Sequence, residues 1–131
     1  MGENKVDVKS DVAEVEAFMR EYNDLFGKGD TKALWNRVYR FDPSGQTVAR
    51  SEADLKKLHD EIAAQGYSHS IIHKMKVTPQ GPDQMRVKFH FERKKKDGSS
   101  FPPGIQASEY DLRKFPDGWR ITSAWMSQLD Q

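Results

Sequence analysis

The chain has 131 residues, which is enough for one domain with a hydrophobic core and too few for two. Its 21 basic and 20 acidic residues almost cancel, so charge repulsion does not oppose folding, and an aromatic content of 11% adds core volume to a low aliphatic content. The absence of cysteine excludes disulfide frameworks, thiolate metal sites and cysteine nucleophiles.

No signal in the sequence points to a membrane or to secretion. No stretch approaches the roughly 20 apolar residues of a membrane span, and residues 1–10 lack the apolar core of a signal peptide. We therefore expect a cytoplasmic protein that does not enter a membrane. Residues 1–8 are expected to form a flexible tail, and residues 9–131 a single domain.

The first predicted element is an amphipathic helix. An apolar stripe of period 3.6 runs through Val12–Phe26, which is typical of a helix with one buried face. Ser10 or Asp11 can cap its start, and Gly27 and Gly29 are expected to end it.

A short second helix and two short strands are predicted next. Asp30 can cap a helix that runs through Trp35. Tyr39–Phe41 and Gln46–Ala49 are predicted to be strands on either side of Asp42–Gly45, which has proline and glycine at the positions typical of a type I turn.

A third helix is predicted from Ser51 to Gly66. The Ser51 hydroxyl can cap it, and Asp54 completes a Ser-x-x-Asp capping box. The apolar stripe of this helix consists of Leu55, Leu58, His59 and Ile62.

After Gly66 the apolar period changes from 3.6 to 2, which predicts strands. The predicted strands are 67–78, 84–93, 105–114 and 119–126. The turns between them are short, so neighbouring strands must be antiparallel. The apolar stripes of the three helices are available to cover one face of this sheet. The sequence therefore predicts an α+β fold with three N-terminal helices packed on a strongly curved antiparallel β-sheet.

The basic residues Arg93–Lys96 are followed by Asp97–Ser100, which is typical of a solvated hairpin tip. A nucleic-acid surface needs a broader basic stripe with interleaved stacking groups, so we expect no nucleic-acid partner. The chain has no glycine-rich phosphate loop, no nucleotide fingerprint and no histidine cluster with metal-ligand spacing, and we expect neither a cofactor nor a metal.

The order of elements resembles the nuclear-transport-factor-2-like superfamily, which includes the SnoaL-like cyclases and ketosteroid isomerase. Three segments carry the resemblance, which extends over roughly residues 10–127. They are Met19–Tyr22 with the following Gly29-Asp30, Phe41–Gly45 and Asp117–Ile121. The resemblance implies a cone-shaped domain with a pocket between the concave face of the sheet and the helices, in a homodimer. The fold hosts many activities and does not by itself fix a function.

The resemblance also implies roles for single residues. Tyr22 matches a tyrosine that donates a hydrogen bond to an oxyanion, and Asp42 matches a general base. Tyr110 lies nearest to a second oxyanion donor, and His59 stands where a supporting tyrosine is expected. The residues also allow structural roles: Asp42 as the first residue of a turn, Tyr22 as a core residue and His59 at the edge of the core.

The sequence pattern alone, independent of the resemblance, indicates two histidines as candidate site residues. His69 and His73 share the more apolar parity of the first long strand, so they are expected to face inward as acid–base groups, ligand donors or packed core residues. Four residues along a strand span about 13 Å, which is too far to chelate one metal ion.

The register of the last hairpin is open between two pairings. A three-residue loop pairs Phe115 with Trp119 and turns the charged face of the preceding strand toward the pocket. That face contains Glu109, Asp111 and Arg113. A four-residue loop pairs Lys114 with Trp119 and turns Tyr110 and Leu112 inward, and we favour it because burying charges is costly. The first pairing would place a carboxylate beside the two histidines.

The predicted pocket is lined mainly by apolar residues, which favours a small apolar ligand. The lining residues predicted are Trp35, Tyr39, His59, Phe89, Ile121 and Trp125. We expect a domain that binds such a molecule and acts as a cofactor-independent isomerase, cyclase or dehydratase, with Asp42 or a pocket histidine moving a proton and Tyr22 and Tyr110 stabilising negative charge. The alternative is a non-catalytic binding or dimerisation module whose cone is filled by Trp and Phe.

Overall fold

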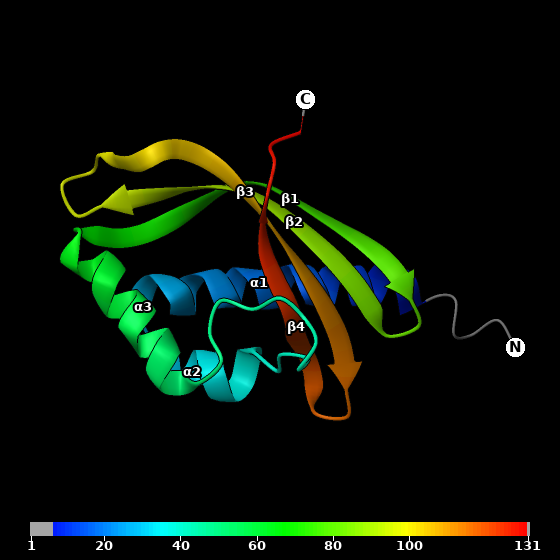
Figure 1. The fold of residues 1–131 in the computed structure, drawn as a ribbon. Coiled ribbons are helices and arrows are strands. Elements are labelled where there is room, and N and C mark those ends of the chain that lie inside the picture. Colours follow the sequence, from blue (N-terminus) through cyan, green and yellow to red (C-terminus); the bar gives the residue numbers. More distant parts are fainter. Residues whose placement is uncertain (1–6, 131) are drawn as a thin grey trace, which may run out of the picture.

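Helices precede strands in the computed structural model, which describes residues 7–130 (Figure 1). The helices are α1 (Asp7–Lys28), α2 (Thr31–Ala33), which continues as the π-helical turn η2 (Leu34–Val38), and α3 (Glu52–Ala64). The strands are β1 (Tyr67–Gly81), β2 (Gln84–Lys95), β3 (Ser100–Phe115) and β4 (Gly118–Ser127). This order confirms the predicted α+β class.

The first helix is longer at both ends than predicted. It begins at Asp7, before the expected caps, and residues 1–6 of the predicted tail lie outside the described residues. It also passes through Gly27 and ends at Lys28, before Gly29, which has a φ of 70°. Of the helices within residues 7–130, none is long and apolar enough to cross a membrane.

The predicted caps of the two later helices are confirmed. Asp30 Oδ1 accepts a hydrogen bond from the backbone N–H of Ala33 at 3.1 Å, and Ser51 Oγ accepts one from Asp54 N–H at 3.1 Å. Beyond α3, Gly66 has a φ of 95°, a left-handed conformation that glycine adopts without strain.

The two short strands predicted at 39–41 and 46–49 are wrong. Tyr39 makes one isolated parallel bridge with Ile121, and the chain then follows the free edge of β4. Three backbone hydrogen bonds attach this segment to β4: Arg40 N–H to Ile121 O (2.8 Å), Asp42 N–H to Thr122 O (3.0 Å) and Ala124 N–H to Gln46 O (3.0 Å). The segment is therefore bonded to the sheet rather than to itself.

The predicted turn in this segment is confirmed. The N–H of Gly45 donates to the carbonyl of Asp42 at 3.0 Å, which closes the turn. A Cβ at Gly45 would meet the Ser123 hydroxyl and lie 3.3 Å from Thr122 O, so the close approach to β4 favours glycine here.

The strands form one antiparallel sheet in the order β1-β2-β3-β4, and the helices gather on one side of it (Figure 1). The face toward the helices is called the inner face here. In β2 it carries Val87, Phe89 and Phe91, and these side chains are buried against α1 residues such as Met19 and Tyr22. The core is thus a layer of aromatic and aliphatic side chains between α1 and the inner face.

The last hairpin follows the favoured pairing only near its turn. Lys114 pairs with Trp119 and Leu112 with Ile121, which confirms the prediction. Thr122 is then an extra residue in β4, and beyond it Tyr110 pairs with Ala124 rather than with Ser123 or Trp125. The bulge reverses the faces of β4, so Ser123 and Trp125 lie opposite the charged residues Asp111 and Glu109.

Replacing Ser51 with alanine should lower the free energy of unfolding by about 1 kcal/mol, because the first turn of α3 loses its side-chain cap. Urea denaturation followed by circular dichroism measures the loss. Ser44→Ala, an exposed serine in the turn before α3, is the matched control and should leave the free energy of unfolding nearly unchanged. Equal losses in the two variants would contradict the capping role.

Candidate functional site

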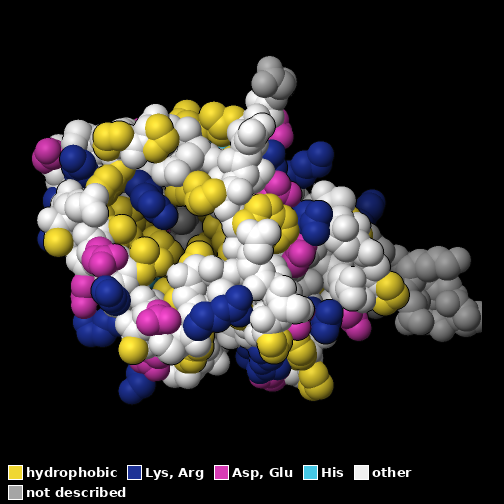
Figure 2. Space-filling model, viewed as in Figure 1, with side chains coloured by type: hydrophobic (Ala, Val, Ile, Leu, Met, Phe, Trp, Pro, Cys, Tyr) yellow, Lys and Arg dark blue, Asp and Glu magenta, His cyan; other side chains and the backbone are white. Residues whose placement is uncertain are grey.

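A cavity lies between α1, α3 and the inner face of the sheet. Figure 2 shows a hollow on this side of the molecule, walled by hydrophobic side chains with a Lys or Arg side chain at its rim. The lining residues are Tyr22, Asn23, Phe26, Val48, Leu58, Ser70, Phe89, Phe91, Arg93, Ser108, Tyr110, Ala124, Trp125 and Met126. The cavity volume is about 90 Å³. A cavity of roughly 150 Å³ holds a benzene ring, so this cavity, which opens to the surface, encloses only part of a small ligand.

Two tyrosines from different elements meet at the cavity. Tyr22 comes from α1 and Tyr110 from β3, and their hydroxyl oxygens are 3.3 Å apart. Their rings meet edge to face with centroids 5.4 Å apart, a favourable geometry for aromatic pairs. Ser108 Oγ donates a hydrogen bond to the Tyr110 oxygen at 2.8 Å. The structure therefore brings together the two tyrosines that the resemblance had linked.

A count of protons shows what this cluster can still donate. Ser108 uses its hydroxyl proton on Tyr110, and the contact between Tyr22 and Tyr110 uses one phenolic proton. Tyr22 also bonds to the hydroxyl of Tyr39, so the hydroxyl contacts run from Ser108 through Tyr110 and Tyr22 to Tyr39. A ligand oxygen in the cavity would replace one of these contacts to receive a phenolic hydrogen bond.

Burial controls the protonation of these phenols. Burial is the largest cause that raises the pKa of Tyr22 and of Tyr110 well above the ordinary value, and repulsion from a second phenolate adds to it. Burial likewise raises the pKa of the neighbouring Tyr39. At neutral pH these tyrosines are hydrogen-bond donors and not bases.

Arg93 is the cationic residue of the lining, and the sequence reasoning missed it. Its guanidinium carbon lies 6.0 Å from the ring centroid of Phe26 and 5.7 Å from that of Phe91. The available signal was strand parity: Arg93 continues the inward alternation of Phe89 and Phe91, but it was grouped with the lysines that follow it.

Asp42 lies away from the cavity. Its side chain is exposed in the turn beside β4 and contributes to a separate polar hollow with Arg86 and Asp111. Two of the charges in that hollow pair with each other, since Arg86 Nε donates to Asp111 Oδ1 at 2.8 Å. The structure therefore does not bring Asp42 together with Tyr22 or Tyr110.

The expectation that His69 and His73 face inward is wrong, because both side chains are exposed. His73 is an extra residue between Ile72, which pairs with Phe91, and Lys74, which pairs with His90. This bulge reverses the faces of the strand before it, so Ser70 and Ile72 point inward there.

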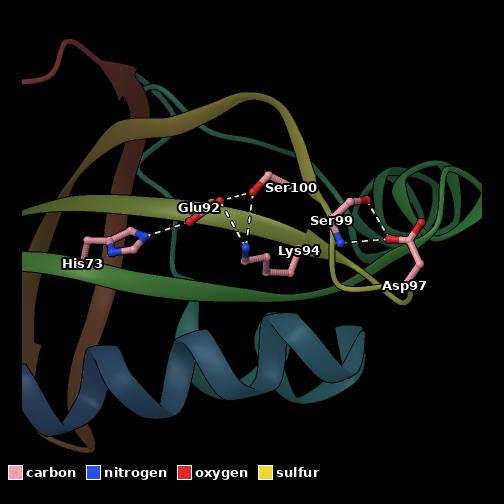
Figure 3. A network of polar contacts seen from close by, with 6 residues as sticks. All are labelled: His73, Glu92, Lys94, Asp97, Ser99 and Ser100. Carbon is pink, nitrogen blue, oxygen red and sulfur yellow. Dashed lines mark hydrogen bonds and ion pairs between the residues drawn. The ribbon is translucent and has the colours of Figure 1, made fainter.

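On the outer face His73 joins a polar network (Figure 3). His73 Nε2 lies 2.9 Å from Glu92 Oε1, and Lys94 Nζ lies 3.3 Å from Glu92 Oε2. Ser100 donates a hydrogen bond to the same carboxylate. The Ser100 hydroxyl and then His73 lower the pKa of Glu92 to about 2, so this carboxylate is ionised in the network at neutral pH.

His59 is buried but does not line the cavity. Its ring packs on Phe26 with centroids 4.3 Å apart, and its Nε2 is buried with no hydrogen-bond partner among the described residues. Burial, followed by the nearby charge of Arg93, lowers its pKa, so the ring is neutral at pH 7. The geometry is that of a packed core histidine.

The other predicted lining residues divide into two groups. Phe89 lines the cavity, and Trp125 does too, although its ring also lies 5.2 Å from the guanidinium carbon of Arg86. Trp35, Tyr39 and Ile121 belong to the core or pack against it and are not part of the lining. No group of three or more His, Asp or Glu side chains suited to a metal ion occurs within the described part of the chain.

A sequence model of the family described as NTF2-like protein (DUF6841) matches residues 11–129, almost the whole chain. A comparison with curated protein sequences gave no match.

Several solved structures share the fold. An NTF2-like protein with a cystatin-like fold from Novosphingobium aromaticivorans is 21% identical with a TM-score of 0.71, and the alignment covers 96% of this chain and 86% of that one. A ketosteroid isomerase-like protein from Erwinia carotovora atroseptica is 19% identical with a TM-score of 0.64 and coverages of 92% and 97%. An NTF2-like superfamily protein from Salmonella enterica is 16% identical with a TM-score of 0.65 and coverages of 95% and 95%. At these identities the likeness shows the fold alone, a cone-shaped α+β domain.

The tyrosines of the native protein should resist ionisation. Burial raises the pKa of all four, namely Tyr22, Tyr39, Tyr67 and Tyr110, above the ordinary value of about 10. The raised pKa means that the folded state favours the neutral tyrosines. Their contribution to the free energy of unfolding is therefore complete below pH 10 and is lost as the pH rises further. Absorbance of tyrosinate near 295 nm follows the titration.

The urea-unfolded chain is the control for this titration, and its tyrosines should ionise near pH 10. In the native protein most of the absorbance change should come later and coincide with unfolding seen by circular dichroism. Ionisation of the native tyrosines near pH 10 would contradict the burial of the cluster.

Proposed function

Because the chain belongs to the family of NTF2-like proteins (DUF6841) and has a small apolar cavity lined by two phenolic hydroxyl groups, we propose that it is a ligand-binding domain. The ligand is a small molecule whose apolar part lies against the phenylalanine side chains of the cavity. One of its oxygen atoms accepts a hydrogen bond from Tyr22 or Tyr110. The observation that carries this proposal is the meeting of the two tyrosines at the cavity.

The chemistry of the lining favours binding over acid–base catalysis. A proton transfer next to a carbonyl group needs a base within hydrogen-bond reach of the substrate. None of the described residues that line the cavity is Asp, Glu or His, and the phenols are held protonated by burial. Isomerisation, cyclisation or dehydration would therefore need a base brought in from elsewhere, and the non-catalytic alternative is the better supported of the two functions.

Other expectations stay predictions. These are the homodimer, the cytoplasmic location and the absence of nucleic-acid and membrane partners.

Substitution of Ala124 by leucine should abolish ligand binding, because the larger side chain occupies a cavity of only about 90 Å³. The probes are cyclopentanone and isobutyramide, which combine a small apolar body with a carbonyl acceptor. Titration of ¹⁵N-labelled protein, followed by amide chemical shifts, should show saturable changes at the cavity residues of the unsubstituted protein and none in the variant.

Ala63→Leu, on the exposed side of α3, is the matched control and should bind as the unsubstituted protein does. If Ala124→Leu fails to fold, Tyr22→Phe provides the test. It removes a hydrogen-bond donor without adding volume and should weaken binding of both probes. Shifts that do not saturate, or that persist unchanged in Ala124→Leu and Tyr22→Phe, would overturn the proposed function.

A further inference from the structure

Arg93 is a cation without a partner in a mostly apolar cavity. Its Nε is buried with no hydrogen-bond partner among the described residues, and no hydrogen bond or ion pair joins its Nη groups to another described residue. A guanidinium stays charged at any physiological pH. The side chain is partly buried and its buried Nε lacks an acceptor, so an anionic group in the cavity would supply the partner that the protein does not.

The aromatic neighbours compensate Arg93 only in part. The rings of Phe26 and Phe91 lie within 6.0 Å of the guanidinium carbon, which allows a cation–π attraction. These rings cannot accept the N–H hydrogen bonds. Two basic side chains of the same strand differ in this respect: Arg86 pairs with Asp111 and Lys88 with Asp130.

We propose that the cavity binds a small monocarboxylic acid, a class of ligand that rests on the proposed function. The carboxylate accepts hydrogen bonds from the Nη groups of Arg93 and from a phenolic O–H of the Tyr22–Tyr110 pair, which turns from its neighbouring hydroxyl to the ligand. The apolar body of the acid lies against Phe89 and Phe91.

The composition of the lining selects this class of ligand. The lining contains one cationic side chain, so one negative charge is balanced and a doubly charged phosphate is not. A carboxylate has acceptors for both the guanidinium and the phenol, and a guanidinium fork matches its geometry. A neutral ligand of the same shape would leave the charge of Arg93 unpaired.

Pairs of an acid and its amide test the inference, because the members differ in charge and hardly in shape. The probes are isobutyrate with isobutyramide and isovalerate with isovaleramide, titrated into ¹⁵N-labelled protein at pH 7 and constant ionic strength. Each acid should bind roughly tenfold to a hundredfold more tightly than its amide, which is the range for a hydrogen bond to a charged group. The side-chain Nε–H resonance of Arg93 should move with the acids.

Arg93→Met keeps an apolar side chain of similar length and removes the charge. It should lower the affinity for the acids at least tenfold and leave the affinity for the amides unchanged, so the preference disappears. Arg20→Met, at an exposed position of α1, is the matched control and should retain the preference.

The outcomes separate the two proposals. If neither acids nor amides cause saturable shifts at the cavity, the proposed function is overturned. If both bind with equal affinity, or the preference for acids persists in Arg93→Met, the proposed function stands and the carboxylate inference is overturned. If Arg93→Met does not fold, the difference in affinity between acid and amide in the unsubstituted protein still tests the carboxylate inference.

Discussion

Two β-bulges determine which side chains reach the space between the helices and the sheet. Side chains of a strand alternate between its faces, so one extra residue reverses every assignment beyond it. In β1 one extra residue is His73, which leaves Ser70 on the inner face and places His69 opposite Lys94. In β4 it is Thr122, whose hydroxyl donates to the carbonyl of Asp111 at 3.2 Å. The inner face is thereby cleared of carboxylate and imidazole groups.

The same strand register explains how a charge comes to lie in an apolar cavity. β2 has regular alternation from Met85 to Phe91, so Arg93 follows Phe89 and Phe91 onto the inner face, where Ser70 is its partner across the ladder. The flanking residues Glu92 and Lys94 point outward and neutralise each other (Figure 3). The cation is therefore placed by backbone geometry and keeps its charge free for a ligand.

Signals between residues close in the sequence predicted much of the fold correctly. Features that depend on contacts between distant segments were not predicted. The caps at Asp30 and Ser51 and the turn at Asp42 depend on residues close in sequence, and all were predicted correctly. Sequence periodicity gave the strands but contained no mark of the bulges, so the faces of His69 and His73 were misjudged. The segment from Tyr39 to Ala49 has strand-like residues, and only tertiary structure determines that it bonds to β4 and not to itself.

Within the site, the family resemblance predicted Tyr22 and Tyr110, whereas Arg93 was identified only in the structure. Their combination has a chemical consequence. A fixed cation and a protonated phenol both stabilise negative charge on a bound oxygen, and neither can take up a proton at neutral pH. A related fold gains acid–base chemistry when a carboxylate or imidazole shares such a cavity. In this chain Asp42 is held outside by its turn and its backbone bond to Thr122, and His59 is held by its packing on Phe26. The cavity is therefore suited to recognising an anion that is already formed rather than to generating one.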